Sequence, residues 1–64
     1  MIDNVPHNAP YYVCGNNPRA DFLTCYTKED NYYDAVISGI AAFMRHKCRI
    51  IVFDRDGNYV WTSD

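Results

Sequence analysis

The sequence lacks an excess of charge of either sign. Its 64 residues include six Lys or Arg and eight Asp or Glu, which gives a formal net charge of −2. A protein that binds phosphate backbones carries a broad positive excess, and a strongly charged imitation of DNA carries many regularly spaced carboxylates. The charge balance therefore argues against nucleic acid as the main partner.

A long hydrophobic run is also missing. The longest weakly polar stretch, 35–44, contains Ser38 and Gly39, whereas a membrane-spanning helix needs roughly 20 apolar residues. Residues 1–10 include no basic side chain and no apolar stretch of signal-peptide length. We therefore expect a cytoplasmic protein without a membrane segment.

Glycine is scarce, with three residues in the chain, and no glycine-rich phosphate loop is present. The candidate nucleophiles are Cys14, Cys25 and Ser38, and the candidate bases are His7 and His46. A nucleophile needs a base within reach and a third group that orients the base, and none of these residues lies in such a local motif. Because a chain this short buries only about 60% of its unfolded surface, there is little room for a preorganised site. We expect no enzymatic activity.

Cysteine occurs three times, at Cys14, Cys25 and Cys48, an odd number that cannot pair completely within one chain. Reduced thiols are therefore expected. Together with His46 the cysteines supply the residue types of a zinc site, but structural zinc ligands come in pairs two to four residues apart. Only His46 and Cys48 are that close. The spacing predicts buried cysteines that pack as small apolar side chains, and no metal or other cofactor.

Acidic residues near the C-terminus resemble a calcium loop in part. Asp54, Asp56 and Asn58 alternate as calcium ligands do, but Gly57 directly follows the second acid and no bidentate Glu comes later. Turn formation explains these residues without a metal.

The order of the segments predicts one small domain over 10–64, preceded by a flexible N-terminal arm over 1–9 that has no periodicity. A strand at 11–14 and a return strand at 21–26 form the first hairpin. A helix follows over about 28–47, with Thr27 as the expected N-cap. The apolar positions expected to cover the sheet are Tyr33, Val36, Ile37, Ile40, Phe43 and Met44. Gly39 is expected to mark a close approach of this helix to the sheet.

The second hairpin joins 49–54 to 58–62 around Asp54-Arg-Asp-Gly57, where Gly57 is expected in the left-handed conformation after a type I turn. The fold class is therefore α+β: a small antiparallel sheet of two hairpins with one α-helix packed across one face, in the order ββαββ.

The register of the second hairpin decides which side chains share a face. We favour the register that pairs Phe53 with Tyr59 and Ile51 with Trp61, because it separates aromatic from aliphatic residues. A strict two-residue turn instead pairs Val52 with Trp61. The sequence alone leaves both registers open.

One helix covers only one face of a sheet, so large apolar side chains on the other face are left for a partner. The predicted protein-binding residues are Tyr11, Ile51, Phe53, Tyr59 and Trp61. Tyr and Trp are enriched among binding hot spots, so Trp61→Ala is expected to weaken binding by about 2 kcal/mol or more while leaving the fold mostly intact. A core that uses these aromatics as filling is the other interpretation.

Two alternatives remain. Arg45, Lys47 and Arg49, with His46 among them, form the one cationic cluster, and together with the aromatic residues, 16% of the chain, they suggest a single-stranded nucleic-acid-binding protein. Their other explanation is charge that complements a helix C-terminus. The last alternative is a homodimeric structural module in which the aromatic face pairs with its own copy.

The layout resembles that of very small phage-encoded host-takeover proteins, including inhibitors of host RNA polymerase and of CRISPR effectors. The resemblance lies in the size and order of elements: a hairpin, a helix opened by Thr27-Lys-Glu-Asp30, and terminal strands at 49–54 and 58–62. It implies a phage or mobile-element protein that docks on a host protein complex and blocks it sterically.

Overall fold

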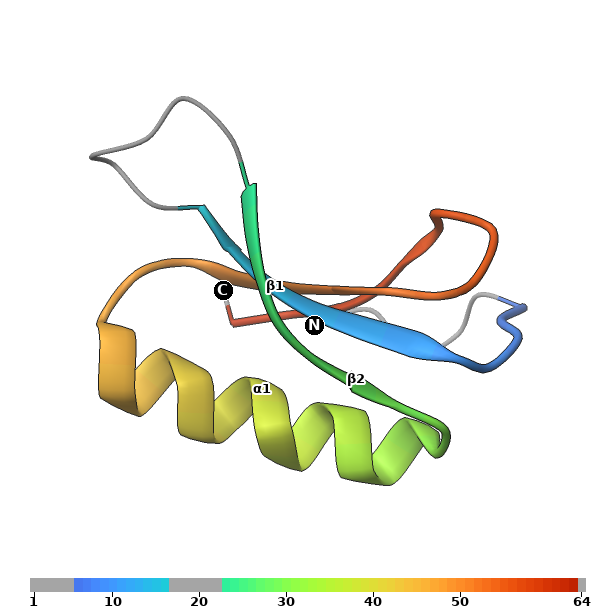
Figure 1. Ribbon diagram of the computed structural model, residues 1–64, viewed down its shortest axis with the longest axis horizontal. Coiled ribbons are helices and arrows are strands. Elements are labelled where there is room, and N and C mark those ends of the chain that lie inside the picture. Colours follow the sequence, from blue (N-terminus) through green and yellow to red (C-terminus); the bar gives the residue numbers. More distant parts are fainter. Residues whose placement is uncertain (1–5, 17–22, 64) are drawn as a thin grey trace.

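The computed structural model describes residues 6–16 and 23–63, which form four strands and one helix. The elements are β1 (Tyr11–Asn16), β2 (Leu23–Glu29), α1 (Tyr32–His46), β3 (Ile50–Phe53) and β4 (Tyr59–Thr62). All four strands lie in one antiparallel sheet, and α1 runs along one of its faces (Figure 1). The predicted α+β class with the order ββαββ is confirmed.

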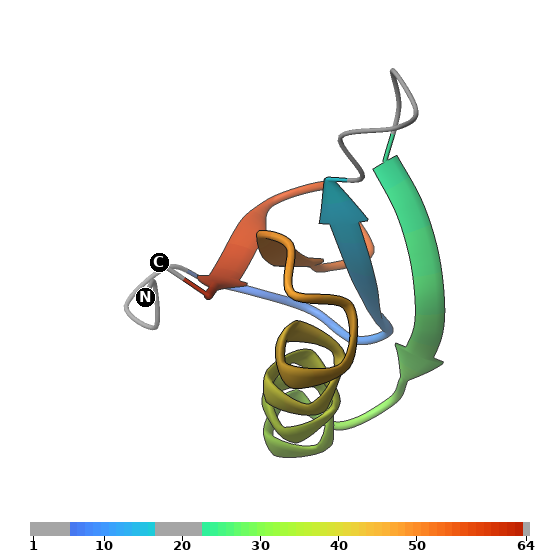
Figure 2. The ribbon, with the colours of Figure 1, turned by 90° about the vertical axis from the view of Figure 1, so that its left-hand side faces the viewer.

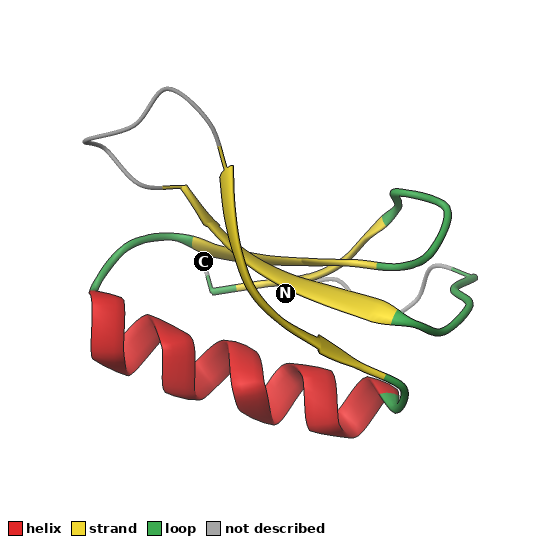
Figure 3. Ribbon diagram, in the orientation of Figure 1, coloured by secondary structure: helices red, strands yellow, loops and turns green. Residues whose placement is uncertain are grey.

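The strand order β2-β1-β3-β4 places β1 between the two strands that α1 connects. The chain leaves β2, crosses the sheet as α1 and returns as β3 on the other side of β1, so the helix packs against β1, β2 and β3 (Figure 3). In the view along the helix, the sheet curves around α1 (Figure 2). One sheet face is therefore covered by α1. The other carries no helix within the described residues, and we call it the helix-free face.

The helix begins later than its sequence pattern predicts. Thr27 remains in β2, which pairs with β1 as far as Glu29, so the predicted N-cap at Thr27 is wrong. Asn31 caps the helix, because its side-chain oxygen accepts hydrogen bonds from two first-turn N–H groups at 2.8 and 3.3 Å. At the other end Lys47 adopts the left-handed conformation with φ 55° and donates its N–H to Phe43 at 2.9 Å.

The face of α1 that packs on the sheet consists mainly of small residues. Ala35 and Gly39 are buried, and Val36 and Ala42 pack beside them. The other five apolar residues that were expected to cover the sheet are exposed: Tyr33, Ile37, Ile40, Phe43 and Met44. That prediction is wrong for these five because the sheet, rather than the helix, supplies the large side chains of the core.

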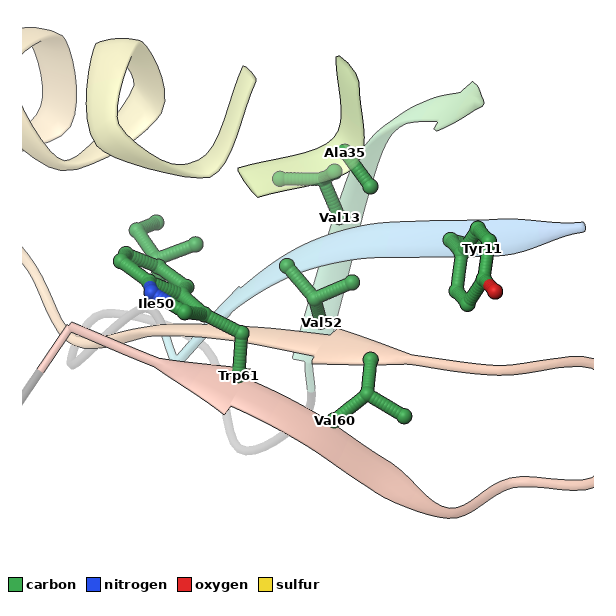
Figure 4. Close-up of a cluster of buried hydrophobic side chains, with 7 residues drawn as sticks. All are labelled: Tyr11, Val13, Ala35, Ile50, Val52, Val60 and Trp61. Atoms are coloured by element: carbon green, nitrogen blue, oxygen red, sulfur yellow. The ribbon is translucent and has the colours of Figure 1, made fainter. Parts of the chain in front are cut away.

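Trp61 is the largest side chain of that core (Figure 4). Its ring lies directly under Gly39, where an added Cβ would come within 2.9 Å of the Trp61 Cζ3 atom. The predicted close approach at Gly39 is therefore confirmed, and its partner is Trp61. The other members of the buried cluster are Tyr11, Val13, Ala35, Ile50, Val52 and Val60.

A bulge in β4 explains why Trp61 lies in the core. Phe53 pairs with Tyr59, as predicted, but the next pair is Val52 with Trp61, so β4 holds one extra residue between the two pairs. A bulge of this kind disturbs the alternation of side chains, and Val60 and Trp61 both join the core.

The predicted pairing of Ile51 with Trp61 is therefore wrong, and Thr62 takes that place opposite Ile51. The turn itself follows the prediction, since Gly57 is left-handed with φ 84°. The register that pairs Phe53 with Tyr59 is thus correct next to the turn, and the register that pairs Val52 with Trp61 is correct beyond the bulge.

A disulfide joins Cys14 of β1 to Cys25 of β2, and Cys48 is free. The expectation that all thiols are reduced is wrong for this pair. A second bulge, on β2, shifts the register after Val13 and brings Cys25 directly opposite Cys14. Sequence spacing does not reveal this pairing, because the extra residue, Tyr26, changes which residues face each other across the strands.

We predict that Gly39→Ala lowers the free energy of unfolding by about 1 to 3 kcal/mol, as overpacking does in a buried site, although alanine favours helix formation. Urea unfolding measures the change. In a Trp61→Phe background the same substitution should be neutral or stabilising, because Phe lacks the ring atoms that the new methyl group would meet. An equal loss in both backgrounds would contradict the proposed contact.

Reduction of the disulfide should lower the free energy of unfolding by about 3 kcal/mol, the value expected for a closed loop of this length. Urea unfolding with and without dithiothreitol measures it. A Cys48→Ser variant should show the same loss, and a Cys14→Ala, Cys25→Ala variant should not respond to the reductant. A response of that double variant would assign the effect to another group.

Candidate functional site

A row of side chains crosses all four strands on the helix-free face. The cross-strand pairs Lys28–Tyr12, Tyr12–Phe53 and Phe53–Tyr59 place these residues side by side. Tyr12 is 37% exposed and Tyr59 48%, while Phe53 between them is half-buried. We call Tyr12, Phe53 and Tyr59 the aromatic row.

The aromatic row has a fixed geometry. The Phe53 and Tyr59 rings meet edge to face, with centroids 4.9 Å apart and planes at 89°. Such pairs are stabilised by the ring quadrupoles in addition to buried area. Two tyrosine hydroxyls on an otherwise apolar strip suit a protein surface, where the rings bury area and the hydroxyls keep hydrogen bonds.

Asp54 stabilises the turn that follows Phe53 at the end of β3. Its carboxylate is buried and accepts hydrogen bonds from the backbone N–H of Asp56 at 2.9 Å and of Asn58 at 2.8 Å, and from the Asn58 side-chain amide at 3.1 Å. Burial alone would raise the pKa of this carboxyl, but the hydrogen bonds outweigh it and lower the pKa below the ordinary value. The ionised form of Asp54 therefore stabilises the hairpin.

The described end of the N-terminal arm lies against this turn. The Asn8 backbone N–H donates to Asp54 at 3.3 Å, and the Asn8 carbonyl accepts from the Arg55 N–H at 3.1 Å. His7 stacks on Tyr32 with ring centroids 4.7 Å apart, and its Nδ1 is 2.6 Å from the Tyr11 hydroxyl. Residues 7 and 8 thus support the end of the sheet that carries the aromatic row.

The five predicted protein-binding residues lie on two different faces of the sheet. Phe53 and Tyr59 lie together on the helix-free face. Tyr11 and Trp61 belong to the core on the helix side, where burial and, secondly, the charge of Asp54 raise the pKa of Tyr11. Ile51 is buried on the helix-free face, in the row of Cys14 and Thr62.

Tyr12 is the surface residue that sequence reasoning missed. Neighbouring residues of a strand point to opposite faces, so only one of Tyr11 and Tyr12 can face the helix. Nothing in the local sequence says which one does. The pairing of Tyr12 with Phe53 decides it, and that pairing depends on contacts far apart in the chain.

The cationic residues lie at the other end of β3. Arg45, Lys47 and Arg49 are exposed around the end of α1 and the start of β3, whereas Phe53 and the aromatic row mark the end of β3. The predicted nucleic-acid residues therefore do not lie beside the aromatic row, although the exposed Phe43 is close to them at the end of α1. His46 of the same segment stacks on Tyr26, with centroids 4.2 Å apart and planes at 6°.

A shallow groove of about 280 Å³ separates β2 from α1 next to this stacked pair. It is lined by Tyr26, Thr27, Ser38, Ala41, Ala42, Arg45 and His46. The Ser38 hydroxyl donates to Glu29 at 2.8 Å, and the Tyr26 hydroxyl contacts the Cys48 sulfur at 3.9 Å. Burial first, and the contact with Cys48 second, raise the pKa of Tyr26.

The disulfide removes Cys14 and Cys25 from the candidate thiol nucleophiles and zinc ligands. Within 6–16 and 23–63, no group of three His, Cys, Asp or Glu side chains is placed to hold a metal ion. In the same part of the chain, no helix is long and apolar enough to cross a membrane.

Comparison of the chain with protein families, curated proteins and solved structures finds no match. The aromatic row is therefore interpreted from its own geometry. It presents an apolar area with two tyrosine hydroxyls, next to the ammonium group of Lys28. These groups can bind a surface by burial and hydrogen bonding.

We predict that the free energy of unfolding falls as the pH is lowered from about 6 to about 2, in part through Asp54. Because the folded state lowers the Asp54 pKa, its contribution is present above the ordinary carboxyl range and is lost as the pH falls through the folded value. Asp54→Asn should reduce this pH dependence in urea unfolding. Asp30→Asn, at an exposed position, is the control, and an equal effect of both substitutions would contradict the role of Asp54.

Proposed function

We propose that this protein is a non-enzymatic protein-binding module that docks on another protein through the aromatic row. The single observation behind the proposal is the line of exposed Tyr12, half-buried Phe53 and exposed Tyr59 across the sheet face opposite α1. The resemblance in layout to phage-encoded host-takeover proteins suggests a host protein complex as the partner.

The mechanism in this proposal is steric occlusion. A sheet held by its backbone ladders and by the hydrogen bonds of Asp54 changes little on binding, so little conformational entropy is lost when it docks. Tyrosine side chains bury large areas with few rotatable bonds. Bound in this way, even a chain of 7.4 kDa covers a functional surface of its partner.

A cytoplasmic location belongs to the same proposal. The Cys14–Cys25 disulfide is the observation that weighs against it, because the glutathione pool keeps most cytosolic thiols reduced. In that compartment the two strands would be held by their backbone ladder without the covalent link.

The test is capture of partners from nuclease-treated source-cell lysate with tagged protein, followed by measurement of the affinity for the captured protein. We expect the combined Tyr12→Ala and Tyr59→Ala substitutions to weaken binding at least about 30-fold, the effect of removing a hot spot worth about 2 kcal/mol. The fold should persist, because both side chains are partly exposed. Circular dichroism checks that condition.

Leu23→Ala is the matched control, because Leu23 is an exposed apolar residue of β2 away from the aromatic row. It should leave the affinity unchanged. Wild-type binding by the double tyrosine variant would overturn the proposal. Binding that is lost on nuclease treatment and falls steeply between about 50 and 200 mM salt would support nucleic acid and the cluster of Arg45, Lys47 and Arg49 instead.

A further inference from the structure

The outer side of α1 carries a second exposed apolar surface, which faces away from the sheet. It consists of Tyr33, Ile37, Ile40 and Met44, which are 75%, 64%, 46% and 68% exposed. The intervals of four, three and four residues are those of the a and d positions of a coiled coil, which form one continuous seam along a helix. We call these four residues the outer stripe.

The spacing of the residues in the outer stripe is the same from either end of the helix. Its midpoint lies between Ile37 and Ile40, and Tyr33 and Met44 lie at equal distances from it. If two copies of α1 pack antiparallel about a two-fold axis at this midpoint, Ile37 of each copy meets Ile40 of the other. At both ends Tyr33 then meets Met44, a contact between an aromatic ring and a thioether that is itself favourable.

The rows that flank the outer stripe are also self-complementary. One residue further along the chain, the row that begins with Asp34 ends with Arg45. In the antiparallel pair Asp34 lies two residue levels, about 3 Å along the helix axis, from Arg45 of the other copy, so each carboxylate lies within reach of the other copy's guanidinium. On the other flank, Val36 of each copy comes near Phe43 of the other copy. Phe43 is exposed. The two helix dipoles also oppose each other in this arrangement.

We propose that the outer stripe of α1 binds a second copy of this chain, in an antiparallel helix pair. A two-fold axis requires one patch to match itself. The outer stripe meets this condition about the midpoint between Ile37 and Ile40, and both flanks meet it about a midpoint one residue further along the helix, about 1.5 Å away. An unrelated partner would require no such symmetry. One helix face is a small interface, so the dimer exchanges with monomer on dilution.

This inference is independent of the aromatic row, which lies on the opposite side of the sheet, and it is tested on the protein alone. Sedimentation equilibrium from about 1 µM to about 1 mM should show a rise from 7.4 kDa toward twice that mass. Ile37→Glu should abolish the rise, because it places two like charges near the axis without disturbing the monomer core. Leu23→Glu, on β2, should leave the rise intact.

A monomeric mass at every concentration overturns the inference, and so does a dimer that survives Ile37→Glu. Capture of a partner through Tyr12 and Tyr59 would be unaffected by either result. If the double tyrosine variant loses capture of the partner but still forms the dimer, partner binding and dimer formation use different surfaces.

The antiparallel register has its own test in a Cys48→Ser background, with oxidised glutathione as the oxidant. Tyr33→Cys and Met44→Cys variants, one of them tagged, should form a disulfide with each other when mixed. Each variant alone should not, because like positions lie about 16 Å apart along the paired helices. Crosslinks within each variant alone, and none between the tagged and untagged variants in the mixture, would indicate a parallel pair and overturn the proposed arrangement.

Discussion

The contact between Trp61 and Gly39 is the constraint on which the rest of the structure depends. An indole ring from β4 fills the space that large helix side chains occupy in most packed layers of helix and sheet, so the helix can approach only with a row of small residues. Because interiors are packed to nearly uniform density, a large residue on one layer requires a small one opposite. The bulge at Val60 and Trp61 is what turns the ring toward the helix.

The same contact determines which surface of α1 remains apolar. With Ala35, Gly39 and Ala42 toward the sheet, the stripe of large apolar residues is rotated to the outside. Amphipathicity normally identifies the buried face of a helix. Here it identifies the face that a monomer leaves in water, and large exposed patches of this kind indicate association.

Element order, fold class and the terminal turn could be predicted from the sequence because each depends on local signals. Periodicity located the helix, and Asp54 to Gly57 specified the turn that is observed. The helix face, the register at Trp61 and the Cys14–Cys25 pair could not be predicted, because each depends on a bulge or on a contact between distant strands. Of the candidate site, Phe53 and Tyr59 followed from the turn together with the register favoured for separating aromatic from aliphatic residues. Tyr12 required the pairing of β1 with β3.

The two proposed surfaces are compatible because they lie on opposite sides of the molecule. The aromatic row lies on the helix-free face of the sheet, and the outer stripe lies beyond the helix that covers the other face. An antiparallel helix pair would therefore leave both aromatic rows accessible and facing in opposite directions. Two linked docking faces raise the apparent affinity for a partner that itself presents repeated or paired sites, since the second contact becomes intramolecular. For a chain with so small a surface, pairing through α1 would thus increase the area that it can block without any change in the aromatic row.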